Sequence, residues 1–168
     1  MFHAVLLTGH IVTGTVALLI GPLAMRQDVR RFAAGEPSTG PVNIWYRWTV
    51  LVVCLSAIGL VLVYRADLWW LVPVSVLTYG LAVLAGESAR RRFRGWTHGY
   101  VHGIGGSYIA LVTALVVVSF VVNGPVSGPA ALIPWLAPTA IGTVLIEVWR
   151  RRLATAPTRR EVDGLRGR

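Results

Sequence analysis

The sequence is poor in charged residues and in cysteine. Only 14% of its 168 residues are charged, whereas a soluble domain has about 25%. Lys is absent, so all 16 basic residues are Arg. The single cysteine, Cys54, excludes a disulfide framework. No P-loop, Gly-x-Ser-x-Gly motif or dinucleotide fingerprint follows a strand-like segment, which argues against the enzyme classes that carry those signatures.

Instead, the sequence has five long apolar runs. They cover residues 3–25, 45–64, 68–86, 100–122 and 131–149. Each is close to the ~20 residues that cross a hydrocarbon core about 30 Å thick. A lone strand in lipid would leave its backbone groups unpaired, so helices are expected. We therefore predict an all-α integral membrane protein, with a five-transmembrane-helix bundle over residues 1–152.

The arginines predict how the bundle is oriented. Fifteen of the 16 lie in the first loop, at the start of the second run, in the third-to-fourth loop or after the fifth run, and only Arg65 lies elsewhere. Because Arg accumulates on the cytoplasmic side, we expect the N-terminus outside, the C-terminus in the cytoplasm, and a multi-pass protein of the bacterial inner membrane. The Arg-rich tail, residues 153–168, is expected to be disordered and to attract anionic lipids. The net charge of +9 thus follows from topology, and no nucleic-acid partner is expected.

Small residues recur along two of the runs. Gly9, Thr13, Ala17 and Gly21 form a stripe with a spacing of four in the first run, and Gly99, Gly103, Gly106 and Ser107 lie on the fourth. Such stripes allow helices to approach closely. We expect the first and fourth helices to contact each other through them, in a monomer, a homo-oligomer or a complex with a partner membrane subunit.

Histidines are the candidate functional residues, because ionisable groups inside a membrane are costly. Our leading hypothesis is a binding or accessory protein that holds a lipid, a quinone or a partner in a cleft between the first and fourth helices. The candidate polar site comprises His10, His98, Tyr100, His102 and Tyr108. A structural hydrogen bond between helices is the other interpretation of His10. No residue is assigned as catalytic.

Two other functions stay open. His98 and His102, spaced i and i+4, could bind a metal with Glu87, or a haem could serve a membrane oxidoreductase. His10 and His102 fall in opposite halves of the bilayer, which disfavours one haem shared between them. A proton-coupled transporter is the third hypothesis, although no inverted repeat is present. Glu147 is expected to pair with Arg151 at the interface.

Three motifs carry a resemblance. They are Gly9-His10-Ile11-x-x-Gly14-x-x-Ala17-Leu18-x-x-Gly21-Pro22, then His102 with Gly106-Ser107-Tyr108-Ile109-Ala110-Leu111-Val112-Thr113-Ala114, and finally Trp135-Leu136-Ala137-Pro138-Thr139-Ala140-Ile141-Gly142-Thr143. The chain resembles a bacterial family of small multi-pass membrane proteins without an assigned function. That family has a His-Arg pair at the start of its second helix, where this sequence has Tyr46-Arg47. The resemblance implies a fold and no reaction.

Overall fold

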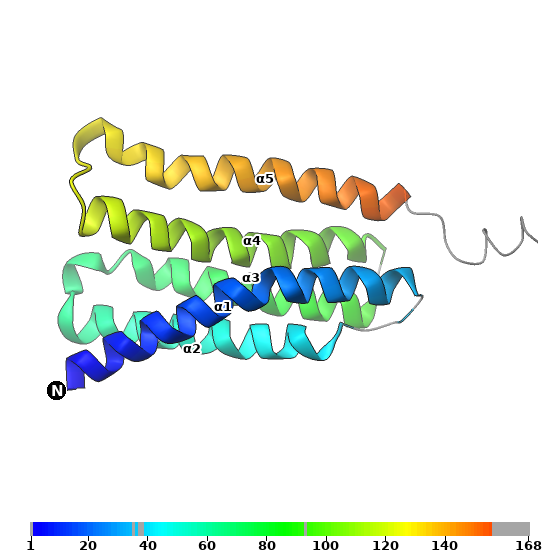
Figure 1. The fold of residues 1–168 in the computed structure, drawn as a ribbon, viewed down its shortest axis with the longest axis horizontal. Coiled ribbons are helices and arrows are strands. Elements are labelled where there is room, and N and C mark those ends of the chain that lie inside the picture. The colour runs from blue at the N-terminus through cyan, green and yellow to red at the C-terminus, as the bar shows by residue number, and fades with distance from the viewer. Residues whose placement is uncertain (1, 35, 37–38, 93, 156–168) are drawn as a thin grey trace, which may run out of the picture.

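The computed structural model describes residues 2–34, 36, 39–92 and 94–155, which form five long helices (Figure 1). The helices are α1 (Phe2–Ala33), α2 (Pro41–Tyr64), α3 (Leu71–Arg91), α4 (Trp96–Val117) and α5 (Leu132–Thr155). A π-helical turn, η2 (Val118–Val122), extends α4, and short 3₁₀ turns, η1 (Ala66–Leu68) and η3 (Gly128–Ala131), precede α3 and α5. These described residues contain no strand. All five helices are long and apolar enough to cross a membrane, which confirms the predicted all-α class.

All five helices extend beyond the apolar runs that predicted them. α1 continues to Ala33, α3 to Arg91 and α5 to Thr155, whereas α2 begins at Pro41 and α4 at Trp96, each four residues early. Apolar residues mark the part of a helix that lies in hydrocarbon, but helical hydrogen bonding continues into the polar interface. The tail expected to be disordered from residue 153 is therefore helical at its start, and its remainder, 156–168, lies outside the described residues.

The distribution of apolar and polar side chains between surface and interior is the reverse of that in a soluble helical bundle. Large apolar side chains point outward: Leu19, Leu62, Leu77, Ile133 and Leu145 are all more than 60% exposed. The buried faces instead hold small and polar residues, including Ala17, Ala82, Ala85, Thr78 and Ser88. An apolar surface of this extent needs lipid around it. Small residues inside allow the backbones to pack closely without a large apolar core.

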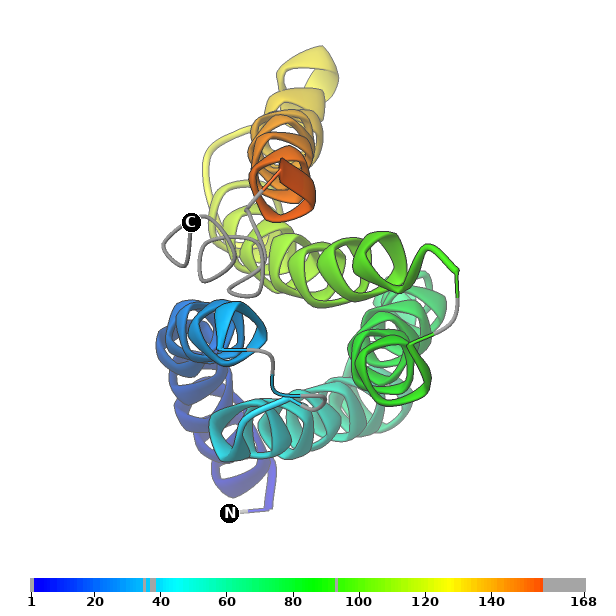
Figure 2. The same ribbon diagram turned by 90° about the vertical axis from the view of Figure 1, so that its right-hand side faces the viewer.

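The helices are not arranged as one symmetrical bundle. Seen end-on, α1 to α4 follow one another around a curve, and α5 lies outside it (Figure 2). α5 packs against α4 and makes little contact with the other helices. α4 therefore has α3 on one side and α5 on another. The ends of α1, α3 and α5 that carry the arginines lie together at the right-hand end of Figure 1, and the N-terminus lies at the left.

Glycines determine where the helices approach most closely. A Cβ atom at Gly103 of α4 would lie 2.7 Å from the backbone nitrogen of Ala85 in α3, so these two backbones are in direct contact. At Gly21 of α1, a Cβ would lie 2.5 Å from the Tyr108 ring of α4. Gly9 has no such neighbour within 4 Å. α1 thus meets α4 at one end of its stripe, whereas Gly103 and Gly106 of the α4 stripe face α3.

Candidate functional site

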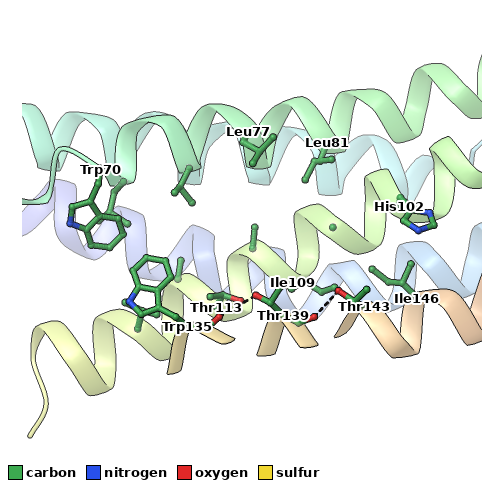
Figure 3. A pocket seen from close by; sticks show the side chains of 16 residues that line it. Trp70, Leu77, Leu81, His102, Ile109, Thr113, Trp135, Thr139, Thr143 and Ile146 are labelled. Carbon is green, nitrogen blue, oxygen red and sulfur yellow. Dashed lines mark hydrogen bonds between the residues drawn. The ribbon is translucent and has the colours of Figure 1, made fainter. Parts of the chain in front are cut away.

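An apolar groove of about 330 Å³ runs between α3 and α5, with α4 as its floor (Figure 3). Its lining residues are Trp70, Leu71, Val74, Leu77 and Leu81 beside or on α3, then His102, Gly106, Ile109, Ala110, Thr113, Ala114 and Val117 on α4, and Trp135, Thr139, Thr143 and Ile146 on α5. Leu77 is 63% exposed, so the groove reaches the outer surface of the bundle. On a membrane protein, that surface is covered by lipid.

The sequence of α4 explains why the groove exists. Gly106, Ala110 and Ala114 recur every four residues and therefore lie on one face of α4. Their side chains are too small to fill the space between the flanking helices. α5 is held on α4 beside this face, because Gly105 packs against Ile146 and would clash with it if a Cβ were added. The groove is thus a consequence of small residues on α4 and of the separation of α3 from α5.

The two ends of the groove differ in character. At one end the Trp70 and Trp135 rings lie 4.9 Å apart and join the start of α3 to the start of α5. At the other end is His102, which lies toward the Arg-bearing end of the bundle (Figure 3). Tryptophan and histidine are amphipathic and suit the two edges of a hydrocarbon layer. The groove therefore spans much of the depth that α4 crosses.

One buried polar group in the groove wall has no partner among the described residues. The hydroxyls of Thr139 and Thr143 donate to carbonyl oxygens of their own helix, at 3.2 and 2.7 Å. The Thr113 hydroxyl is buried and makes no hydrogen bond within the described part of the chain. An unpaired buried hydroxyl is unfavourable, typically by about 1–3 kcal/mol.

His98 and His102 lie together at the start of α4. Their ring centroids are 3.9 Å apart, and His102 Nδ1 donates to the His98 carbonyl oxygen over 3.1 Å. Glu87, the third residue of the predicted metal site, instead accepts from Arg90 and Arg91 at 2.8 and 2.9 Å. Among the described residues no three His, Cys, Asp or Glu side chains are grouped to hold a metal ion. The geometry gives these two histidines no third ligand.

The other predicted cleft residues do not share one site with His102. His10 Nδ1 lies 2.9 Å from the Ser56 hydroxyl, between α1 and α2. The Tyr108 hydroxyl donates to the Leu18 carbonyl oxygen at 3.2 Å, and Tyr100 is fully buried. Of these four residues only His102 lines the groove. His10 makes the interhelical hydrogen bond that was its other interpretation. Glu147 pairs with Arg151, as expected, and also with Arg150.

Sequence reasoning missed the buried Asp28 of α1. Its Oδ1 accepts from the Gly40 backbone N–H at 2.6 Å, and its Oδ2 accepts from Asn43 Nδ2 and from the Tyr100 hydroxyl, both at 2.8 Å. Asp28, Gly40, Asn43 and Tyr100 are here called the Asp28 cluster. The cluster caps the start of α2 and ties α1, α2 and α4 together at the Arg-bearing end.

Asp28 lies among Arg26, Arg30 and Arg31, in a segment that was predicted to be the first loop. A signal for its burial does exist in the sequence. Ala17, Gly21, Ala24 and Asp28 are the buried residues of α1, and their spacings of four, three and four place them on one helix face. Extending the small-residue stripe by two turns would have led to this carboxylate.

Tyr46, which stands where the family that the chain resembles has histidine, is fully buried. Its hydroxyl lies 2.9 Å from that of Ser107, whose proton is donated to the Ile104 carbonyl oxygen at 2.9 Å. Tyr46 can therefore donate to Ser107 and join α2 to α4. This chain uses the position for a hydrogen bond between helices.

The chain matches no protein-family model, no curated protein and no solved structure. The resemblance to the small multi-pass family therefore stays a prediction.

Proposed function

We propose that this protein is a lipid-binding accessory protein of the bacterial inner membrane. It holds one lipid-like molecule with its apolar chain in the α3–α5 groove and its polar head near His102. The groove itself is the observation that carries the proposal. Its volume of about 330 Å³ lies at the lower end of ligand pockets, which span about 300–1,000 Å³. The sequence alone suggested a cleft between α1 and α4, and the groove replaces that location.

The chemistry of the groove favours a long apolar chain. Leu, Val and Ile supply seven of the sixteen lining residues, and the floor is the small-residue face of α4. The groove reaches the lipid-facing surface, so a membrane lipid can enter it sideways. The unpaired Thr113 hydroxyl and the His102 ring are two of the few polar groups in its wall. A lipid or a quinone with an acceptor group matches this pattern, whereas a polar solute does not.

The orientation is part of the proposal. The Arg-bearing ends of α1, α3 and α5 lie together, and the positive-inside rule assigns that end to the cytoplasm. The C-terminus is then cytoplasmic and the N-terminus external. A fluorescent or alkaline-phosphatase reporter fused to the C-terminus tests this, because phosphatase activity there would contradict it.

Lipid binding in the groove is tested by a substitution that places a large side chain in it. Ala110→Phe places a ring on the floor of the groove, whereas Ala140→Phe makes the same change on an exposed part of α5. Extraction in a mild detergent, followed by native mass spectrometry, should show one lipid-sized adduct on the wild type and on Ala140→Phe, and none on Ala110→Phe. Thr113→Val should weaken retention about fivefold, the worth of one hydrogen bond. Equal retention by all variants, or no adduct on the wild type, would overturn the proposal.

A further inference from the structure

A second feature of the bundle lies apart from the groove, where Arg47 occupies the second turn of α2. Arg47 is half-buried, and within the described residues no hydrogen bond or ion pair to it is present. An arginine at the level of a membrane is costly unless its charge is balanced. The positive charge of Arg47 therefore needs a negatively charged partner.

No acidic side chain in the described residues is that partner, because each is already occupied. Asp28 accepts from the Asp28 cluster, Glu36 pairs with Arg31, Asp67 with Arg65, Glu87 with Arg90 and Arg91, and Glu147 with Arg150 and Arg151. The guanidinium of Arg47 keeps its five donors for something outside the described residues.

Arg47 also lines a small pocket. The pocket has a volume of about 160 Å³, and Ile44, Trp48 and Tyr79 complete its lining. A cavity needs only about 10–15 Å³ of such volume to hold one water, so the pocket has room for a phosphate group. Ile44 is 53% and Trp48 60% exposed, so the mouth of the pocket faces lipid rather than another helix.

Gly86 of α3 makes room for the guanidinium. A Cβ at residue 86 would lie 2.5 Å from Arg47 Nη1 and 3.0 Å from Cζ. The side chain therefore lies across α3 at a point where only glycine leaves space. The guanidinium thus lies against α3 beside the pocket, and a side chain at residue 86 would displace it.

We propose that Arg47, in the pocket formed with Trp48 and Tyr79, binds the phosphate of one anionic phospholipid from the leaflet at the Arg-bearing end. Guanidinium and phosphate form paired, charge-assisted hydrogen bonds. Tryptophan at the mouth suits the glycerol and ester level of a bilayer. The lipid-facing mouth and the apolar Ile44 favour a phospholipid over a free anion. This site is separate from the groove, so either proposal can fail without the other.

The test compares lipids that differ only in headgroup. The purified full-length chain in detergent micelles is titrated with phosphatidylglycerol or with phosphatidylcholine of identical acyl chains, and bound lipids are counted by native mass spectrometry. We expect one phosphatidylglycerol to bind the wild type about tenfold more tightly than phosphatidylcholine, because the choline cation offsets the charge of its own phosphate and so weakens its attraction to Arg47. Arg47→Gln should abolish that preference.

Two further variants separate a built site from a general effect of charge. Gly86→Ala keeps every charge but displaces the guanidinium, and it should also lower the phosphatidylglycerol affinity. Arg26→Gln removes an exposed arginine from the same end and should change nothing. Circular dichroism and gel filtration confirm that each variant is folded. The proposal is overturned if Arg26→Gln and Arg47→Gln act alike, if Gly86→Ala has no effect, or if millimolar inorganic phosphate displaces the lipid, which would indicate a site for free anions.

Discussion

Replacing the buried carboxylate of Asp28 should strongly destabilise the bundle. In Asp28→Asn the amide oxygen can still accept from the Gly40 N–H, but an NH₂ group replaces the oxygen that now accepts from Asn43 and Tyr100. The hydroxyl of Tyr100 can rotate and accept from the new amide, whereas Asn43 Nδ2 then meets another donor. Of the three charge-assisted hydrogen bonds, the one from Asn43 is lost and the other two become neutral. At about 1.5–3 kcal/mol for each charged bond, we expect the free energy of unfolding to fall by about 3 kcal/mol.

The assay is equilibrium unfolding of the full chain in mixed micelles with increasing dodecyl sulfate, followed by helical circular dichroism. Tyr100→Phe removes one donor and should cost about 1.5 kcal/mol. Because Asp28 and Tyr100 share a bond, the double variant should cost less than the sum of the two single changes.

Asp67→Asn is the matched control, since Asp67 is exposed and pairs only with Arg65 among the described residues. It should leave the unfolding transition in place. If Asp28→Asn shifts that transition no more than Asp67→Asn does, the Asp28 cluster does not hold the helices together and the reasoning fails.

Two further predictions follow from local geometry. Gly103→Ala should destabilise the protein by about 1–3 kcal/mol, because the new Cβ meets the α3 backbone. Gly80→Ala, whose Cβ would have no neighbour within 4 Å, should be neutral or slightly stabilising in the same unfolding assay. Equal effects of the two substitutions would contradict the close approach of α3 and α4. Hydrogen bonds from the Arg65 guanidinium lower the pKa of Asp67 below its ordinary value, so this interaction is present at neutral pH and is lost as pH falls through the lowered pKa. A carboxyl ¹³C titration should show that Arg65→Gln raises the pKa of Asp67, and an unchanged pKa would count against the pair.

The number and type of the helices follow from the sequence because the constraint is local. Lipid penalises every unpaired backbone group and every charge within a span, so each apolar run had to be a helix whatever its neighbours were. Helix ends were less well predicted. Apolar residues mark the hydrocarbon layer, whereas α1 and α3 continue through their arginines.

The candidate sites depend on how the helices are placed, which hydropathy does not specify. His102 was singled out from the sequence, but only the packing of α5 on α4 decided that it lines a groove with Trp135 rather than a cleft with His10. In the sequence Asp28 is one of several charged residues in a predicted loop. Only the structure shows that the start of α2 and Tyr100 donate hydrogen bonds to it. The buried carboxylate is stable here because three donors, two at the start of α2 and one on α4, converge on it. Local sequence thus determined that five helices form, and side-chain volume and hydrogen bonding between helices decided where they leave space and where they close.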